Sequence, residues 1–550
     1  MKLSDKVCRI FGLSLTTVLL SACSSQDERD MSAQQANLDG QVASSTGTSP
    51  AVTHYAASRF LEQSSMGPSA DSVARVRSIG YSAWINEQLK KPVSRIATPS
   101  DLIFFDQVND RARLDRAWDF HNAAMLDVPV GADDQLRARV AWVLSNFLVV
   151  STARVNAYGG SEYWNTLTTG AFGSYGDLLT AISVSPSMGN FLDNNQNKRT
   201  GLNENYGREL MQLFSVGMVL LNPDGTTKRD SAGKPIETYS QKDVIEITRA
   251  LTGWNFAPLA QSEQVMNNHN FANYGKAMVA RHSGDHDTDS KMVLGKSIPA
   301  GGDAARDLAA VVEILMSHPN TAPFVSLRLI QGLTTSDPSP SYLGRVSAVF
   351  QRTRGDLAQV VTAILMDSEA RAGDIPGSGS RNFGRIREPY LLHTTILRGL
   401  RCRLAPRWSH QPSRVAYTAD QRPLRADTVF NFYPPSHRAP GSNLLAPEQK
   451  TLDSREFADR LGRYGDWREE SVLASAGCDV QTFTRAIAKS DDALLDLLSE
   501  RYFRGAMPAT VRQGLKDGWA GQYWYRNTPT QMLGFMIQLA AMTPPMGAAK

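Results

Sequence analysis

Apolar residues recur at three- and four-residue spacing along most of this 550-residue chain. That spacing is typical of helices with one buried face, whereas a half-buried strand alternates apolar and polar residues. Sustained alternation is confined to residues 218–239. The sequence therefore predicts a mainly α protein, a multi-helix body with a small β-hairpin arm. We expect helices over residues 69–79, 82–89, 111–128, 134–153, 175–183, 304–317, 323–333, 341–350, 356–368, 388–400 and 529–542.

The length of the chain indicates more than one lobe. Single hydrophobic cores rarely exceed about 250–300 residues, so two lobes are expected. A Gly- and Ser-rich stretch over 372–385 gives the predicted boundary between an N-terminal helical lobe (53–375) and a C-terminal helical lobe (386–550). The helix predicted at 134–153 is apolar over most of its surface, which places it at the centre of the core.

Residues 1–22 have the layout of a signal peptide. A short apolar run, Ile10–Leu20, follows three basic residues (Lys2, Lys6 and Arg9). Leu20-Ser-Ala-Cys23 then matches a lipobox, which predicts cleavage before Cys23 and lipidation of that cysteine. Alternatives are an ordinary secretory signal with an accidental cysteine, or a membrane anchor. The apolar run is too short to span a bilayer, so lipidation is favoured.

The residues after Cys23 bear on where the protein is held. Residues 23–52 are polar and predict a flexible tether between the lipid and the folded body. Ser24 follows the lipidated position, as in outer-membrane lipoproteins of Gram-negative bacteria, which predicts a site in the cell envelope facing the periplasm or the cell surface. Loss of residues 1–22 lowers the formal net charge from +4 to +2. So small a charge argues against nucleic acid as a partner.

Two cysteines, Cys402 and Cys478, remain in the folded part. The envelope outside the cytoplasm is oxidising, so a disulfide between them and a pair of separate buried thiols are both open.

The densest polar chemistry lies in residues 191–256. We expect a helix from Asn203, as N-cap, to Gly217, as a left-handed residue after the last turn. A second helix begins at the capping box Ser240-x-x-Asp243 and ends at Gly253. Gly207 within the first helix predicts a close approach of another backbone.

These two helices carry the candidate catalytic and binding residues. Glu204, Glu209 and Asp243 are candidate catalytic groups, together with His286 from a later loop. Candidate ligand contacts, to a polar ligand such as a sugar, are Asn203, Asn205, Arg208, Trp254 and Asp287. The alternative is a structural network, including Glu246 and Arg249, that locks the helices together.

Two arrangements could hold a metal ion. Asp193, Asn195, Asn197 and Glu204 occupy EF-hand-like positions for Ca²⁺, although Lys198 stands where that loop needs Gly. A solvated Asn-rich turn that caps the next helix is the favoured explanation of these residues. His286 and Asp287 lie near three further candidate ligands (His282, Asp285 and Asp289), which suits a divalent metal or a general base. A turn whose side chains bond their own backbone is the alternative.

Several strings resemble one family. NENYGRELMQLFSVG, LNPDGTTKRDSAGKPIETYSQKDV, TRALTGW and HDTDSKMVLGKSIP are similar to the signature blocks of domain-of-unknown-function family 1800. Further similar segments are Arg59-Phe-Leu, Gly80-Tyr-Ser-Ala-Trp, Arg139-Val-Ala-Trp, His318-Pro-Asn, Arg387-Glu-Pro, Val429-Phe-Asn-Phe-Tyr and Leu445-Ala-Pro-Glu. The family comprises secreted bacterial proteins without an assigned activity. The resemblance also implies a possible partner from a second secreted family, number 1501.

The expected function is therefore that of an envelope lipoprotein, anchored through Cys23, that binds a polysaccharide or a protein partner. The alternative is a secreted enzyme of unrecognised type, such as a metal-assisted hydrolase acting on envelope or imported polymers. The chain has no Gly-x-Ser-x-Gly, His-Glu-x-x-His, Walker A or dinucleotide glycine motif, so familiar hydrolases and nucleotide enzymes are not indicated.

Overall fold

The structure is a computed structural model that describes residues 51–97, 110–258, 273–280, 282, 284–404, 421–469, 472–521 and 528–550. The predicted signal peptide, Cys23 and nearly all of the tether lie outside these residues. Within the described ranges, no helix combines the length and the apolar character that crossing a membrane requires.

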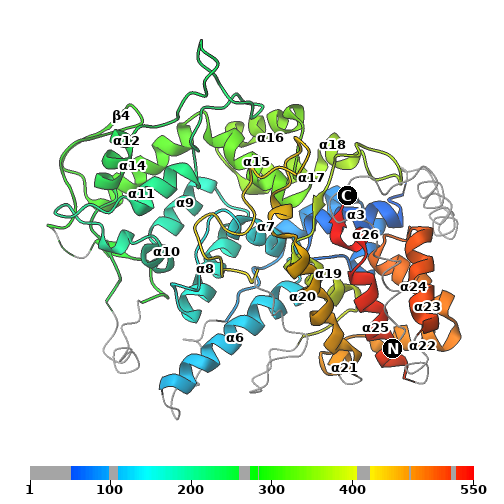
Figure 1. Cartoon of the computed structure of the whole chain (residues 1–550). Helices are drawn as coiled ribbons and strands as arrows, with labels where there is room; N and C mark the ends of the chain where they lie inside the picture. Colours follow the sequence, from blue (N-terminus) through cyan, green and yellow to red (C-terminus); the bar gives the residue numbers. More distant parts are fainter. Residues whose placement is uncertain are drawn as a thin grey trace.

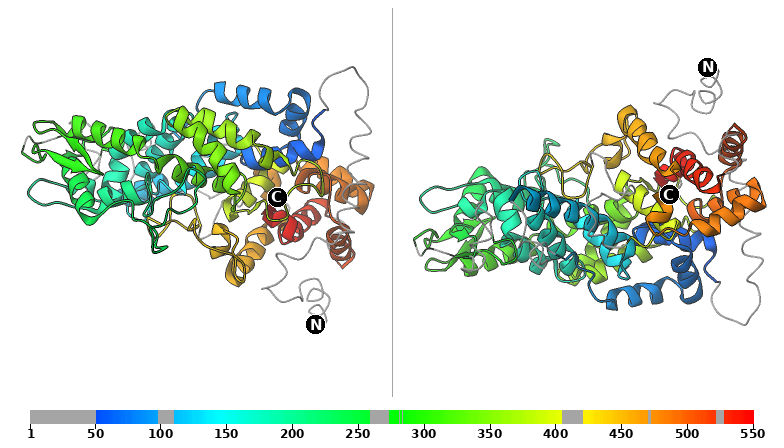
Figure 2. Two further views of the ribbon diagram at one scale, coloured as in Figure 1. Left: turned by 90° about the horizontal axis from the view of Figure 1, so that it is seen from above. Right: turned by 90° about the horizontal axis from the view of Figure 1, so that it is seen from below.

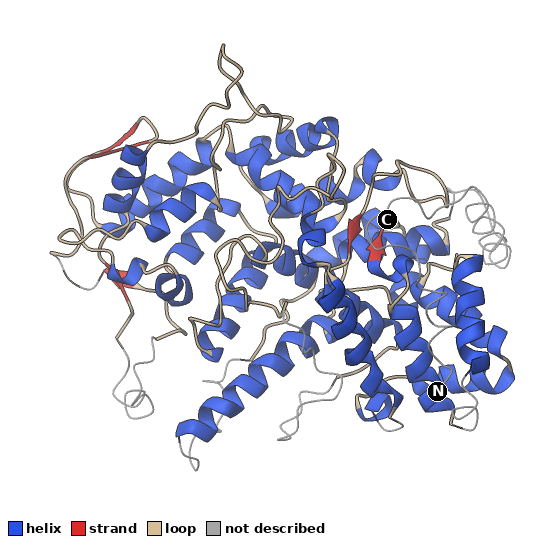
Figure 3. Cartoon of the chain, viewed as in Figure 1, coloured by secondary structure: helices blue, strands red, loops and turns tan. Residues whose placement is uncertain are grey.

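The fold is mainly α, as predicted (Figure 3). The first part contains α3 (His54–Ser64), α4 (Ala70–Ile79), α5 (Tyr81–Lys90), α6 (Asp110–Gly131), α7 (Gln135–Ser145), α8 (Ala157–Gly170), α9 (Tyr175–Ser183) and α10 (Pro186–Phe191). The middle part contains η2 (Asn194–Gln196), α11 (Asn205–Gln212), α12 (Gln241–Ala250), α14 (Ala304–Ser317), α15 (Thr321–Leu333), α16 (Pro340–Arg352), α17 (Leu357–Met366) and α18 (Ser368–Arg371). The last part contains α19 (Pro389–Gly399), η3 (Pro447–Thr451), α20 (Ser454–Gly465), η4 (Asp466–Arg468), α21 (Val472–Ser475), α22 (Val480–Lys489), α23 (Asp491–Tyr502), α24 (Ala509–Gly521), α25 (Pro529–Ala541) and α26 (Pro544–Gly547).

The strands are short and antiparallel. They form three two-stranded pairs: β1 (Trp254–Asn255) with β2 (Val279–Ala280), β3 (Lys291–Val293) with β4 (Lys296–Ile298), and β5 (Arg385–Ile386) with β6 (Ala548–Ala549). Residues 218–239 form the predicted arm, held by isolated bridges such as Val219↔Glu237 and Arg229↔Pro235. The arm projects from the body at the top of Figure 1. Asn320, from the His318-Pro-Asn segment, fixes its base by donating to the carbonyls of Val216 and Val219.

Helix α7 lies at the centre of the core, as its apolar surface predicted. All eleven of its residues are buried, and it packs between α8 and α15. The helix ends at Ser145 and is therefore shorter than the predicted helix over 134–153. Buried apolar residues from Ala57 to Met546 form one connected cluster around it.

The beginning and the end of the folded chain lie side by side. Figure 1 shows α3 next to α26, and the body is longer than it is thick in Figure 2. Arg59 of α3 donates to Asp374 and to the carbonyl of Lys550, while Glu62 pairs with Arg387 and Arg504. These contacts join the two predicted lobes, so the boundary at 376–385 stays a prediction.

The local signals around α11 and α12 are largely confirmed. Ser240 and Asp243 form the predicted capping box, and Gly217 and Gly253 adopt φ of 70° and 89°. The N-cap of α11 is Glu204, one residue later than predicted, because Asn203 accepts the N–H of Asn205 instead of capping the first turn. The helix ends at Gln212, earlier than the predicted end just before Gly217.

Cys402 and Cys478 are joined by a disulfide, which resolves the two alternatives left by the sequence. It ties the end of α19 to the loop before α22.

Candidate functional site

Helices α11 and α12 lie against each other at the position that Gly207 indicated. A Cβ added at Gly207 would lie 2.7 Å from the Thr248 hydroxyl oxygen, closer than carbon and oxygen can approach. The glycine thus permits the close contact of these helices.

The candidate catalytic carboxylates have separate partners. Glu204 pairs with Arg208 at 2.8 Å and accepts from Gln241. Asp243 accepts from Ser240 and from the N–H of Leu294 at 3.0 Å. Burial alone would raise the pKa of Asp243, but these hydrogen bonds lower it. Both carboxylates therefore accept hydrogen bonds at helix ends and between neighbouring elements.

Glu209 differs from these two because it is buried. Its side chain is 8% exposed, and Oε2 has no hydrogen-bond partner. Burial raises its pKa above the ordinary value, while the nearby Arg208 opposes the shift. Glu204 and Glu209 both lie near Arg208, whereas Asp243 and His286 contact other groups.

His286 and Asp287 belong to a buried ionic network. Nδ1 of His286 lies 2.9 Å from the Thr252 carbonyl oxygen, and Nε2 lies 3.3 Å from Asp307. Lys291 pairs with the same Asp307 carboxylate at 2.5 Å, with its own side chain fully buried. The imidazole is thus enclosed by structural partners.

Arg249 connects this network to α12. Its guanidinium donates to Asp287 at 2.8 Å, to Glu246 at 3.1 Å and to the carbonyl of Ser290 at 3.2 Å. The hydrogen bonds that Arg249 donates to Asp287 raise the pKa of Arg249. Burial alone would raise the pKa of Asp287, but the same hydrogen bonds lower it. These contacts are those of the locking network that the sequence left as an alternative. The catalytic assignment stays a prediction.

The EF-hand-like residues are also drawn to different partners. Asp193 pairs with Arg154 at 3.2 Å and accepts from Asn205. Asn197 donates to the Thr248 carbonyl and accepts from the N–H of Asn203, as a capping turn would. Asn195 Oδ1 has no partner. In the described part of the chain, no three His, Cys, Asp or Glu side chains are grouped to hold a metal ion.

The other predicted contact residues line neither the cavity beside Trp118 nor the cavity beside Asp127, which are described below. Trp254 is 8% exposed in β1, and its indole N–H has no hydrogen-bond partner. His282 is exposed, while Asp285 and Asp289 form ion pairs with Lys198 and Arg199.

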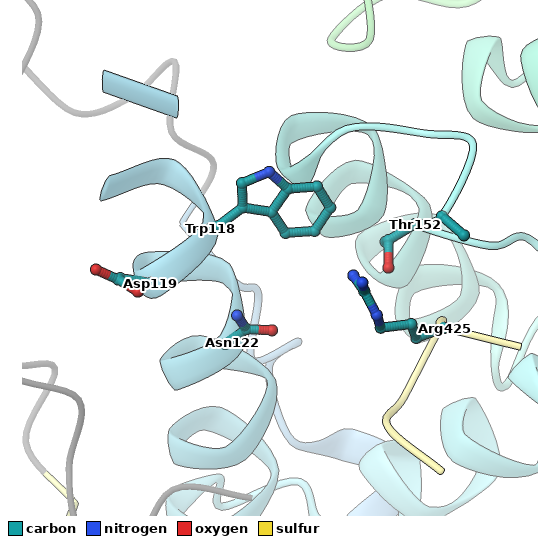
Figure 4. Close-up of a pocket in the computed structure, with 6 residues that line it drawn as sticks. Trp118, Asp119, Asn122, Thr152 and Arg425 are labelled. Carbon is teal, nitrogen blue, oxygen red and sulfur yellow. The ribbon is translucent and has the colours of Figure 1, made fainter. Parts of the chain in front are cut away.

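An open cavity lies elsewhere, beside α6. Its volume is about 560 Å³, and it is lined by Trp118, Asp119, Asn122, Thr152, Ala153 and Arg425. In Figure 4, Trp118, Asn122, Thr152 and Arg425 face one another, and Asp119 points away. The Arg425 guanidinium lies 6.0 Å from the centre of the Trp118 ring, within cation–π range.

The wall of this cavity is built from three segments. Trp118 and Asn122 are one turn apart on α6, so they point to the same side. Thr152 donates, through both its N–H and its hydroxyl, to the carbonyl of Leu424 at 2.7 Å, which fixes the neighbouring Arg425 opposite α6. Leu424 has a φ of 52°, a left-handed conformation that a bulky residue rarely adopts and that often accompanies binding sites.

Arg425 is the cation among the described residues that line this cavity, and the Asp119 carboxylate, which also lines it, points away from the other side chains (Figure 4). The His121 ring contacts the Trp118 ring. The pKa of His121 is lowered to about 4 by burial and by the positive charge of Arg425. The imidazole is therefore neutral at pH 7. The cavity combines one cation with an aromatic ring, a carboxamide and a hydroxyl, a set suited to a polar or anionic ligand.

A family model described as "Protein of unknown function (DUF1800)" matches residues 59–546. The chain belongs to this family. No curated protein and no solved structure matches it. The DUF1800 region includes the Trp118 cavity and the ionic network of His286 and Arg249.

Separate DUF1800 blocks meet in a second buried network at the centre of the molecule. Arg385 pairs with Glu388 at 2.6 Å and with Glu448 at 2.7 Å. Trp142 donates to Glu388, and Arg139 donates to the carbonyl of Gly332. Arg139, Glu388 and Glu448 come from the Arg139-Val-Ala-Trp, Arg387-Glu-Pro and Leu445-Ala-Pro-Glu segments. These signature segments thus build the interior of the DUF1800 fold.

Sequence reasoning missed the Trp118 cavity. The four-residue spacing of Trp118 and Asn122 was a readable signal on the helix predicted at 111–128. Arg425 lies about 300 residues later, and no local pattern connects it to α6.

Proposed function

We propose that this DUF1800 protein is a lipid-anchored lipoprotein of the bacterial cell envelope that binds a polysaccharide in the Trp118 cavity. The observation that supports binding is the combination of an indole with a guanidinium, a carboxamide and a hydroxyl around an open 560 Å³ space. Sugar rings offer apolar C–H faces that stack on an aromatic ring, and hydroxyls that bond to planar polar side chains. Arg425 favours sugars that carry carboxylates.

The anchoring part of the proposal is supported by the N-terminal sequence. The lipobox ends at Cys23, and a polar stretch separates it from the folded body that begins near His54. A polysaccharide-binding body on such a tether reaches polymers at the membrane surface without leaving it.

Replacing Cys23 with Ala should release the protein from the membrane. The wild-type chain, expressed in a Gram-negative host, is expected in the membrane fraction, because a lipidated cysteine carries enough acyl chains for stable anchoring. Fractionation and labelling with a radioactive fatty acid measure this. Cys8→Ala, which changes a cysteine within the signal peptide, is the matched control and should remain anchored. Equal membrane retention of Cys23→Ala would remove the anchoring proposal.

Replacing Trp118 with Ala should weaken polysaccharide binding by at least about tenfold, since buried aromatic contacts dominate such sites. Titration calorimetry with alginate and laminarin oligosaccharides measures acidic and neutral sugars separately, and alginate should bind more tightly. Trp519→Ala on α24 removes another half-buried indole and should bind as wild type does. Wild-type protein that binds neither sugar, or Trp118→Ala that binds as tightly, would contradict the proposal.

The sequence-based alternatives have less support. A metal-assisted hydrolase needs Glu204, Glu209, Asp243 and His286 to act together, but Asp243 and His286 contact other groups than Glu204 and Glu209, which both lie near Arg208. A protein partner, including one from family 1501, would be favoured instead if the oligosaccharides fail to bind.

A further inference from the structure

A second cavity lies along another face of α6, the long helix at the lower edge of the body in Figure 1. Its volume is about 480 Å³, within the range of sites for small organic molecules. Six lining residues follow one stripe of the helix at three- and four-residue spacing: Phe120, Ala123, Ala124, Asp127, Val128 and Gly131. The small side chains on this stripe leave the space open, and Leu404 and Ala97 extend its apolar wall.

Among the residues that the structure describes, Asp127 is the one carboxylate that lines this cavity. It stands at a position where the stripe requires an apolar residue, and it has no hydrogen bond or ion pair with any residue that the structure describes. Burial raises its pKa to about 7, and no other charge contributes to the shift. Partly apolar surroundings without a partner leave an ionised carboxylate poorly solvated.

The polar groups around Asp127 are engaged elsewhere. On α19, Tyr390 donates its hydroxyl to the Met125 carbonyl, which Pro129 leaves without its helical N–H donor. Arg398 donates to the carbonyls of Gly67 and Val130. At the rim, Arg95 lies 3.7 Å from Glu162 of α8, with 61% of its side chain exposed. None of these groups neutralises Asp127.

We propose that this cavity binds an organic amine, with the apolar part of the ligand against α6 and the protonated nitrogen paired with Asp127. An anion would meet the negative carboxylate, and a neutral apolar molecule would leave that carboxylate unpaired. A cation provides the missing partner, and an apolar body matches the alanine, valine and phenylalanine lining. The site lies on a different face of α6 from the Trp118 cavity and does not depend on the proposed polysaccharide binding.

The test compares two probes of nearly equal shape, 1-naphthylmethylamine and 1-naphthylmethanol. Titration calorimetry with the full mature protein at about pH 8.5 keeps Asp127 ionised. The amine should bind at least about tenfold more tightly than the alcohol. Asp127→Asn should abolish this preference, and Ala123→Leu, which fills the cavity, should weaken the binding of both probes.

Asp133→Asn is the matched control, because it removes an exposed carboxylate six residues away in sequence and should keep the preference. Three outcomes would overturn the proposal. They are wild-type protein that binds neither probe, equal affinity for the amine and the alcohol, and a preference that persists in Asp127→Asn. The Trp118→Ala variant should bind the amine as wild type does, which separates this site from the polysaccharide cavity.

Discussion

Replacing Arg385 with Met should destabilise the protein by about 3–5 kcal/mol. Arg385 is 7% exposed and holds two buried carboxylates, Glu388 and Glu448, through charge-assisted hydrogen bonds of 2.6–2.8 Å. Its Nε also donates to the Gln331 carbonyl at 3.0 Å. Methionine fills much of the space but leaves both carboxylates without this cation. Uncompensated buried charge is the costly outcome of breaking such a network.

Urea unfolding followed by circular dichroism measures this effect. The matched control is Arg345→Met, which removes a bidentate pair with Asp367 of 2.7 and 2.8 Å on the surface, where the Arg345 side chain is 49% exposed. That variant should lose at most about 1 kcal/mol. Adding Glu388→Gln and Glu448→Gln to Arg385→Met should restore part of the stability. A loss for Arg385→Met no larger than that of the control would contradict the role of this network.

The buried network around Arg385 also shows that signature segments need not mark a functional site. Arg139, Glu388 and Glu448 are separated by up to about 300 residues in sequence and meet only through the fold. All three lie in segments that resemble signature blocks of the family, and all three are buried. In this chain, segments that resemble DUF1800 signature blocks therefore contribute to the interior of the molecule.

Local patterns predicted the structure where short-range physics decides it. The capping box at Ser240, the left-handed Gly217 and the close approach at Gly207 each depend on a few neighbouring atoms, and each is confirmed. The central position of α7 followed from its apolar surface. The mainly α class followed from spacing alone.

Long-range partners could not be predicted in the same way. His286 meets Asp307, and Arg249 meets Asp287, through contacts that no spacing encodes. His286 and Asp287, which were selected for their chemistry, therefore lie in a locking network. The stripe on α6 did contain a readable anomaly, since Asp127 interrupts a run of small and apolar residues at helical spacing.

Asp127→Asn should make the stability of the protein less sensitive to a rise in pH from about 4 to about 7. The pKa of Asp127 is raised by burial from 3.8 to about 7. Below the lower value the carboxyl is protonated in both states. Between the two values the folded state alone retains the proton, so the favourable contribution of the neutral carboxyl is lost as pH rises through about 7. Asparagine is neutral throughout and does not show this loss.

The full pKa shift of Asp127 corresponds to a free-energy change of about 4 kcal/mol, which is an upper bound. The actual change is smaller because the cavity admits solvent. We therefore expect the stability advantage of Asp127→Asn over wild type to grow by about 2 kcal/mol between about pH 5 and about pH 8.5, measured by urea unfolding. Asp133→Asn, whose carboxylate is exposed, should follow the wild-type pH dependence. If Asp127→Asn followed it too, Asp127 would be solvated or paired in the folded protein. The proposed amine site would then lose its support, because a bound cation stabilises a carboxylate only where that carboxylate lacks another partner. If the advantage grows as expected and disappears when 1-naphthylmethylamine is added, the same carboxylate accounts for both the cost in the free protein and the preference in the complex.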